Sequence, residues 1–237
     1  CHEVGHSLGL RHNMIASNAY ATDSLRSKAF TDKVKGTAAS IMDYARFNYV
    51  AQPVDGIKQI SPQIGPYDMM AIEWGYRWFP DEKGAAEKQQ AFLKKHSGKE
   101  YRYSEAQSQR TAMDPRALSE DLGDDAMKSA GYGIENLKRV MPNIVEWTRT
   151  GEPGQTYDEA SKLYHGVIFQ WSLYLYHVLA NVGGMYIDNT TIDDGKQTFT
   201  FVEKDKQKRA VQFLIDEVFT CPKWLFRSAL NKYTFIN

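Results

Sequence analysis

The sequence predicts a predominantly helical α+β fold with one β-hairpin, and three observations lead to this prediction. Hydrophobic residues form 42% of the 237-residue chain, which is enough to bury a sizeable core. Apolar residues recur at helical spacing along most of the chain. Residues 184–202 differ, because two β-prone runs flank the turn signal Asp193-Asp194-Gly195. The composition fits one or two ordinary globular domains.

Regular structure near the N-terminus is expected to be short. The opening segment HEVGHSLGLRH, residues 2–12, has helical spacing, and Gly9 suits a left-handed cap that ends the helix. Residues 23–36 predict a weak helix with a capping-type start. Residues 45–66 are rich in proline and glycine, which break regular elements, and predict a long loop.

A further helix is predicted from Tyr67, because Pro66 favours a helix start. Its apolar residues, which include Met69 and Tyr76, fall close to one face, and we expect this helix to pack under the opening one. The charged stretch 82–100 then marks a seam between two lobes.

The remainder of the chain predicts a helical lobe. Five helices and one hairpin are expected, the helices near 84–96, 124–149, 156–182, 204–219 and 222–231, and the strands at 184–192 and 197–202. The predicted domains are therefore 1–80, which carries the opening helix, and 81–237, the helical lobe with its hairpin.

The stretch between Lys162 and Asp188 has 25 consecutive residues without Asp, Glu, Lys or Arg. A membrane span is the first interpretation to test. We reject it, because polar residues such as His165, Gln170 and His177 lie inside the stretch and are costly in lipid. The sequence predicts a central core helix instead, with its aromatic residues in the packed core and no transmembrane segment.

Charge and cysteine content exclude several classes of partner and site. Basic and acidic residues both number 29, so attraction to nucleic acid is not expected. Cys1 and Cys221 are too few for a disulfide framework and do not reveal a redox compartment. The chain opens with Cys1, already inside a motif, so we expect a processed protein or a fragment.

The opening helix carries the pattern of a metal site. His2 and His6 are four residues apart, so a helix presents both imidazoles on one face, as two ligands of a tetrahedral zinc require. His12 supplies a third ligand if the chain turns sharply at Gly9, which tolerates positive φ. Glu3 can then reach a zinc-activated water, take its proton and deliver it to a leaving amine. The residues therefore predict a catalytic Zn²⁺ site.

The full pattern HExxHxxGxxH resembles the metzincin superfamily of zinc peptidases, which also has a methionine turn downstream. Ser40-Ile41-Met42-Asp43-Tyr44 looks like that turn and is close to the form found in astacins and serralysins. The resemblance implies that Met42 forms a hydrophobic floor beneath the imidazoles. It implies that Tyr44 binds zinc or stabilises the oxyanion, although a buried structural tyrosine is the alternative.

Longer segments extend the resemblance over most of the chain. HEVGHSLGLRHN, SIMDYARFNYVAQP, GPYDMMAIEWGY and DLGDDAMKSAGYGIENLK together resemble a bacterial metzincin-like zinc peptidase family whose members are exported. The resemblance implies a zinc endopeptidase acting on peptides or proteins, located outside the cytoplasm. It also implies a missing upstream subdomain that aligns the substrate, so the fragment alone is expected to be weakly active or inactive.

Some features allow two interpretations. Asp43 could orient a ligating histidine or stabilise the turn. The acidic residues Glu120, Asp121, Asp124 and Asp125 favour helix capping over calcium binding, because they lack the spacing of a calcium loop. His165 and His177 are expected in the core or at its rim.

The rival to the enzyme hypothesis is a protein- or polymer-binding module with a vestigial zinc site. The intact Glu3, a residue specific to chemistry, argues against it.

Overall fold

The computed structural model describes residues 1–80, 84–105, 113–192, 195–226 and 229–233. Within these residues the fold is predominantly helical with one two-stranded sheet, as predicted. The helices are α1 (His2–Ser7), α2 (Lys28–Val34), α3 (Pro66–Tyr76), α4 (Ala85–Lys95), α5 (Ala126–Val140), α6 (Ile144–Trp147), α7 (Asp158–Leu179), α8 (Lys204–Leu214) and α9 (Lys223–Phe226). The strands are β1 (Met185–Ile187) and β2 (Phe199–Phe201).

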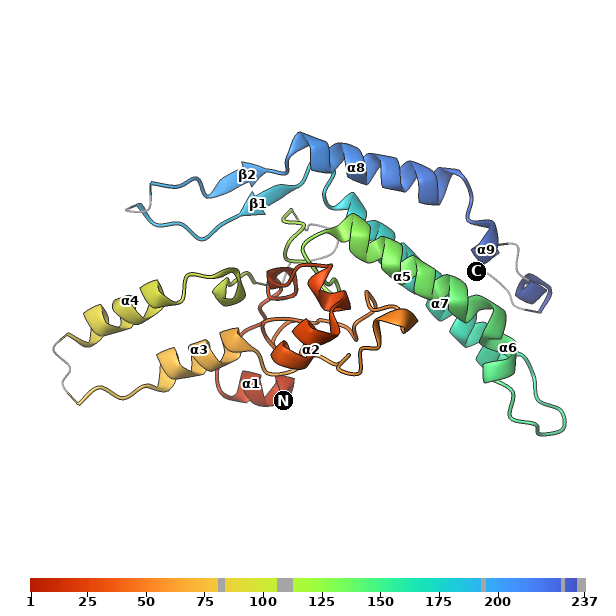
Figure 1. Ribbon diagram of the computed structural model, residues 1–237, viewed down its shortest axis with the longest axis horizontal. Coiled ribbons are helices and arrows are strands. Elements are labelled where there is room, and N and C mark those ends of the chain that lie inside the picture. The colour runs from red at the N-terminus through yellow and green to blue at the C-terminus, as the bar shows by residue number, and fades with distance from the viewer. Residues whose placement is uncertain (81–83, 106–112, 193–194, 227–228, 234–237) are drawn as a thin grey trace.

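The elements lie in two regions (Figure 1). The short helices α1 to α3 gather near the N-terminus, and the long helices α5, α7 and α8 lie side by side in the second region. The largest apolar cluster lies among α5, α6, α7, α8 and α9 and includes the fully buried Tyr164 and Ile144. A second cluster is built around Leu25 and Val50, and Leu122 from the later half of the chain joins it. Segments far apart in sequence therefore contribute to the smaller core.

Helices α5 and α7 make the most extensive pairing in the helical region. Helix α5 begins where the Asp125 side chain accepts a hydrogen bond from the Lys128 amide at 3.2 Å, which satisfies one of the free amides at the helix start. The two helices approach closely at Gly133, because a Cβ there would lie 2.5 Å from the Tyr174 ring. A glycine at this position allows the aromatic ring to pack against the backbone.

Most of the predicted helices are present, with three differences. The helix predicted over 204–219 is α-helical to Leu214 and continues as a π-helical turn, Ile215–Phe219. The helix predicted over 124–149 is divided into α5 and α6 by a 3₁₀ turn at Met141–Asn143, since Pro142 supplies no amide hydrogen to continue the ladder. The helix predicted over 222–231 ends at Phe226, and residues 227–228 lie outside the described part of the chain. No described helix is both long and apolar enough to span a membrane.

The predicted hairpin is present and is shorter than expected. Strands β1 and β2 pair antiparallel, with Met185 opposite Phe201 and Ile187 opposite Phe199. Gly195 has φ of 60°, a value that glycine adopts without steric cost. The turn residues 193–194 lie outside the described residues.

Helix α3 begins at Pro66, one residue before the predicted start at Tyr67, and lies beside α1, where the Tyr76 hydroxyl donates to the Leu8 carbonyl at 3.0 Å. The prediction of its buried face is wrong. Met69 and Tyr76 are 66% and 62% exposed, whereas Asp68 and Met70 are buried. The N-terminus of α3 packs end-on against residues 39–41. This packing buries the Asp68 side chain and leaves Met69 and Tyr76 exposed.

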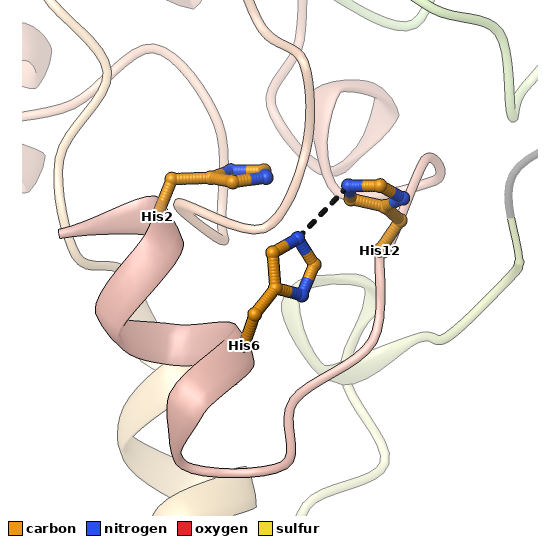
Figure 2. Close-up of side chains that lie close together, drawn as sticks. All are labelled: His2, His6 and His12. Carbon is orange, nitrogen blue, oxygen red and sulfur yellow. Dashed lines mark hydrogen bonds between the residues drawn. The ribbon is translucent and has the colours of Figure 1, made fainter.

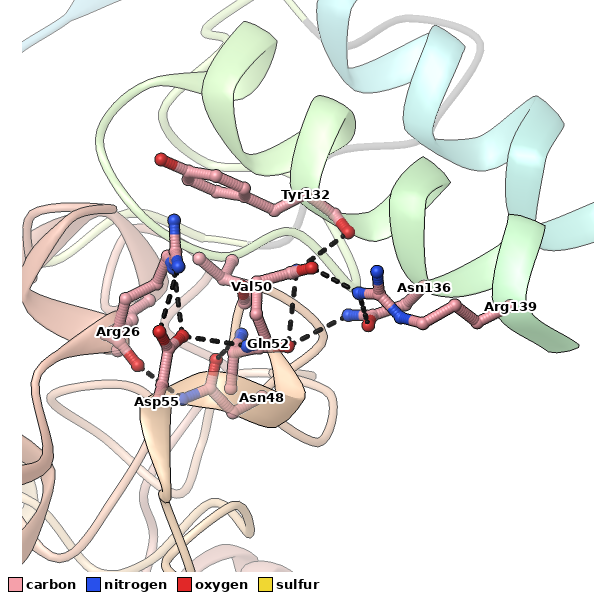
Figure 3. Close-up of polar contacts among 10 residues, drawn as sticks. Arg26, Asn48, Val50, Gln52, Asp55, Tyr132, Asn136 and Arg139 are labelled. Carbon is pink, nitrogen blue, oxygen red and sulfur yellow. Dashed lines mark hydrogen bonds and ion pairs between the residues drawn. The ribbon is translucent and has the colours of Figure 1, made fainter.

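The predicted loop 45–66 is held by side chains and contains only a short 3₁₀ turn, Pro53–Asp55. Arg26 donates to both oxygens of Asp55 at 2.9 and 2.8 Å, and this contact lowers the Asp55 pKa (Figure 3). From α5, Asn136 donates to the Ala51 carbonyl at 2.9 Å, and the loop's Gln52 donates to the Tyr132 carbonyl at 3.1 Å. These contacts fasten the loop to the helical region.

Candidate metal centre

Helix α1 and the turn after it bring three histidines together (Figure 2). His2 and His6 lie one helical turn apart, and Gly9 has φ of 85°, so the chain reverses without strain and places His12 opposite them. The left-handed end predicted at Gly9 is confirmed.

The three imidazoles face one point. The Nε2 atoms of His6 and His12 are 3.1 Å apart, and one ligand nitrogen from each of the three rings lies within 4.8 Å of the others. The ring centroids are separated by 4.8 Å for His2 and His6, 5.2 Å for His2 and His12, and 4.6 Å for His6 and His12. Within the described part of the chain, no other group of His, Cys, Asp or Glu side chains meets this spacing.

Backbone carbonyls fix the orientation of two of the rings. His2 Nδ1 lies 2.6 Å from the Ile41 carbonyl and His6 Nδ1 lies 2.9 Å from the Leu10 carbonyl. A carbonyl oxygen only accepts, so both Nδ1 atoms carry the proton, and a neutral ring keeps its lone pair on Nε2. Sequence analysis missed these two carbonyls, because a backbone acceptor leaves no signature in residue identity.

The donor set fits a metal ion. The Nε2 atom of His2 is buried and has no hydrogen-bond partner among the described residues. The Nε2 atoms of His6 and His12 would repel each other as two lone pairs unless a proton or a cation lay between them. Burial lowers the pKa of His12, and the neighbouring His6 and His2 lower it further. A neutral imidazole with a free lone pair is the form that binds zinc.

The Ser40–Tyr44 segment places the Tyr44 side chain against the histidines and the Met42 side chain beneath α1. The Tyr44 ring stacks on His2 at 5.3 Å and lies 4.5 Å from His12, and its side chain is 46% exposed. Met42 is fully buried beneath α1, and a Cβ on Gly5 would lie 2.3 Å from its sulfur. The small residue in α1 thus lets the helix sit directly on Met42.

A family model described as Met-zincin matches residues 1–236. The chain belongs to the Met-zincin family. No curated protein and no solved structure matches it. Membership in this family implies a metallopeptidase, with zinc as the metal and peptides or proteins as substrates.

Glu3 of this Met-zincin lies next to His2 on α1 and is exposed. Its negative charge acts on the centre, because it partly opposes the lowering of the His12 pKa. Among the described residues, Asp43 makes no hydrogen bond to a histidine. Its Oδ2 accepts from the Ser17 amide at 2.6 Å, which favours the interpretation of a turn-stabilising residue.

The acidic residues 120–125 have separate partners. Asp125 caps α5, as expected, but Asp124 accepts from the Thr22 amide at 3.1 Å and Glu120 pairs with Arg46. Asp121 accepts from the Ser17 hydroxyl at 3.1 Å. The preference for helix capping therefore holds for Asp125 alone. The other three carboxylates join the helical region to residues 17–46.

The histidines of α7 are apart from the metal centre. His177 is buried, with Nε2 3.0 Å from the Ser119 carbonyl, and burial lowers its pKa to about 4. His165 is exposed. His177 therefore lies in the core, one of the two positions expected for these histidines, whereas His165 lies on the exposed face of α7.

Proposed function

We propose that this chain carries the catalytic centre of a zinc endopeptidase, with His2, His6 and His12 as the metal ligands. The observation that carries the proposal is the convergence of three imidazoles, whose orientation directs the Nε2 lone pairs of His2 and His6 toward the space between the rings. Three protein ligands leave one position for water or substrate, as in catalytic zinc sites. Membership in the Met-zincin family supports the same reaction class.

Zinc supplies Lewis acidity when bound, polarising the scissile carbonyl and lowering the pKa of a water molecule from 15.7 to about 7. Glu3 is proposed as the general base that takes the water proton and then delivers it to the leaving amine. Its place on α1, one residue after His2 and open to solvent, supports this role.

Tyr44 is proposed to stabilise the oxyanion. Its ring contacts both His2 and His12, and its partial exposure leaves the side chain accessible to a substrate. The phenol would donate a hydrogen bond to the developing negative charge on the scissile carbonyl oxygen. Met42 is proposed as the floor of the site, an assignment that its complete burial under α1 supports. We also propose that the Ser40–Tyr44 segment is related to the methionine turn of astacins and serralysins.

The decisive experiment compares Glu3→Gln with Glu73→Gln, an exposed glutamate of α3 paired with Arg77, both made in the full-length protein. Zinc content is measured by metal analysis and hydrolysis with a peptide library, each with and without a chelator. We expect Glu3→Gln to retain zinc and to lose about 10²–10⁴-fold in rate, the usual contribution of a general base. Glu73→Gln should behave as the unaltered protein. Retained turnover in Glu3→Gln would refute the role of Glu3.

Two further outcomes test the enzyme assignment itself. Cleavage that a chelator does not affect would exclude the zinc mechanism. Bound zinc without cleavage of any peptide would favour the binding module.

We also propose a division into lobes 1–80 and 81–237. The buried members of the largest apolar cluster all come from residues 127–230, which supports a separate core for the second lobe. An extracytoplasmic location belongs to the same proposal and rests on the resemblance to exported peptidases. Cell fractionation with a tagged protein tests it, and recovery in the cytoplasm alone would contradict it.

A further inference from the structure

The acceptor that orients His2 comes from a distant part of the chain. The His6 ring is held by Leu10, four residues away, but the His2 ring is held by the Ile41 carbonyl, 39 residues away. The direction in which His2 Nε2 points therefore depends on where the Ile41 peptide group lies. Residues that fix this peptide act on the metal centre without touching it.

The buried carboxylate of Asp68 holds the two peptide groups that flank Ile41, one directly and the other through Ser40. The Ile41 amide donates to Asp68 Oδ2 at 2.8 Å, and the Ser40 hydroxyl donates to Asp68 Oδ1 at 2.5 Å. The same Ser40 oxygen accepts from the Met42 amide at 2.9 Å. Asp68 is 3% exposed, so water does not replace these contacts easily.

Asp68 is itself rigidly placed. It is the third residue of α3, and its Oδ2 also accepts from the Gly65 amide at 2.8 Å, which caps the helix start. The Tyr67 amide donates to the Ala39 carbonyl at 3.0 Å. The N-terminus of α3 is thereby bonded to three successive residues, 39 to 41. Helix α3, the Ile41 peptide and the His2 ring form one continuous chain of hydrogen bonds.

We propose that Asp68 is a positioning residue for the metal centre, holding the Ile41 carbonyl so that His2 presents Nε2 to the metal. The inference rests on the proposed zinc site. Partners that orient a ligating histidine contribute typically 10–100-fold to metal affinity. Asp68 acts one step further out, through a peptide group, and removing its charge loosens that group.

The chain offers a matched control in Asp55. Both aspartates follow the same local pattern, a proline two residues earlier and a capped amide three residues earlier, and Asp55 accepts from the Gln52 amide at 2.8 Å. The remaining contacts of Asp55 go to Arg26 and not to residues 39–41 (Figure 3). Asp55→Asn therefore disturbs an equivalent helix cap without reaching His2.

The experiment titrates the full chain with Co²⁺ and with Zn²⁺ against a chromophoric chelator and records the visible Co²⁺ bands. We expect Asp68→Asn to weaken the affinity for both ions by up to about 10-fold, the lower end of the range for a direct partner, and to shift the Co²⁺ bands. Asp55→Asn should keep the affinity and the spectrum, although its melting temperature falls. Asp68→Glu is expected to recover part of the affinity, because it restores the charge.

The inference is overturned if Asp68→Asn keeps the unaltered affinity and spectrum, or if Asp55→Asn loses as much. If Asp68→Asn does not fold, Ser40→Ala replaces it in the titration, because it removes only the contacts of the Ser40 hydroxyl with Asp68 and the Met42 amide. A smaller loss of affinity in the same direction supports the inference, and an unchanged affinity overturns it. If the unaltered chain binds neither ion, the zinc site itself is wrong, which distinguishes the two failures.

Discussion

Replacing Gly65 by alanine tests whether α3 is packed end-on against the Ser40–Tyr44 segment. Gly65 has φ of −112°, which any residue adopts, so backbone conformation alone predicts that alanine is tolerated. In a compatible conformation, glycine to alanine stabilises a protein by about 0.4–1 kcal/mol through the unfolded state. The tertiary structure predicts the opposite sign.

The steric cost follows from the distances at this position. A Cβ on Gly65 would lie 2.1 Å from the Ala39 oxygen and 2.3 Å from the Ala39 carbonyl carbon, and both are backbone atoms that cannot rotate away. Overpacking of this kind costs about 1–3 kcal/mol. Displacing Ala39 also weakens its hydrogen bond with the Tyr67 amide, which contributes about 0.5–1.5 kcal/mol. After the gain from the unfolded state is subtracted, the expected loss is about 0.5–4 kcal/mol.

Thermal unfolding followed by circular dichroism measures the effect. For a chain of this size the loss corresponds to a fall in melting temperature of roughly 1–16 °C. Gly75→Ala is the control, because Gly75 lies in the same helix, is exposed and would place a Cβ with nothing within 4 Å. It should raise the melting temperature by roughly 1–4 °C. A Gly65→Ala variant as stable as the unaltered protein, or more stable than Gly75→Ala, would refute the end-on packing.

Three other predictions follow from the site and the core. Zinc at a hundredfold excess over its Kd should raise the free energy of unfolding by about 2.7 kcal/mol, seen as a higher melting temperature, and His12→Ala should abolish the rise. Tyr44→Phe should lower kcat by about 10²–10³-fold with little change in KM, the loss of one oxyanion donor, and an unchanged kcat in peptide hydrolysis would exclude that role. Burial lowers the folded-state pKa of His177 from 6.5 to about 4. Between pH 6.5 and pH 4 the histidine is therefore protonated in the unfolded chain but neutral in the folded one, so the folded state loses stability as the pH falls through this range. Between pH 7 and pH 5 this residue should account for about 2 kcal/mol in urea unfolding, and His177→Gln should reduce the pH dependence by that amount.

Several features of the fold could be predicted from local sequence. The turn at Gly9 and the start of α3 at Pro66 depend on residues within one turn of each other, and the antiparallel hairpin joins two β-prone runs that follow each other in the sequence. The break between α5 and α6 was missed, although Pro142 was a local signal for it. The helical period of the surrounding residues outweighed one proline in that prediction.

The sequence by itself determined the metal-binding residues proposed here, because the spacing of His2, His6 and His12 is a property of one helix and the turn that follows it. Only the tertiary structure decided how the rings are oriented and which side of α3 is buried. The Ile41 carbonyl, which contacts the His2 ring, lies 39 residues after His2 in the sequence. The Asp68 carboxylate, which holds Ile41, lies 66 residues after His2. Contacts across such distances depend on how whole segments pack, and residue identity at either end does not specify them.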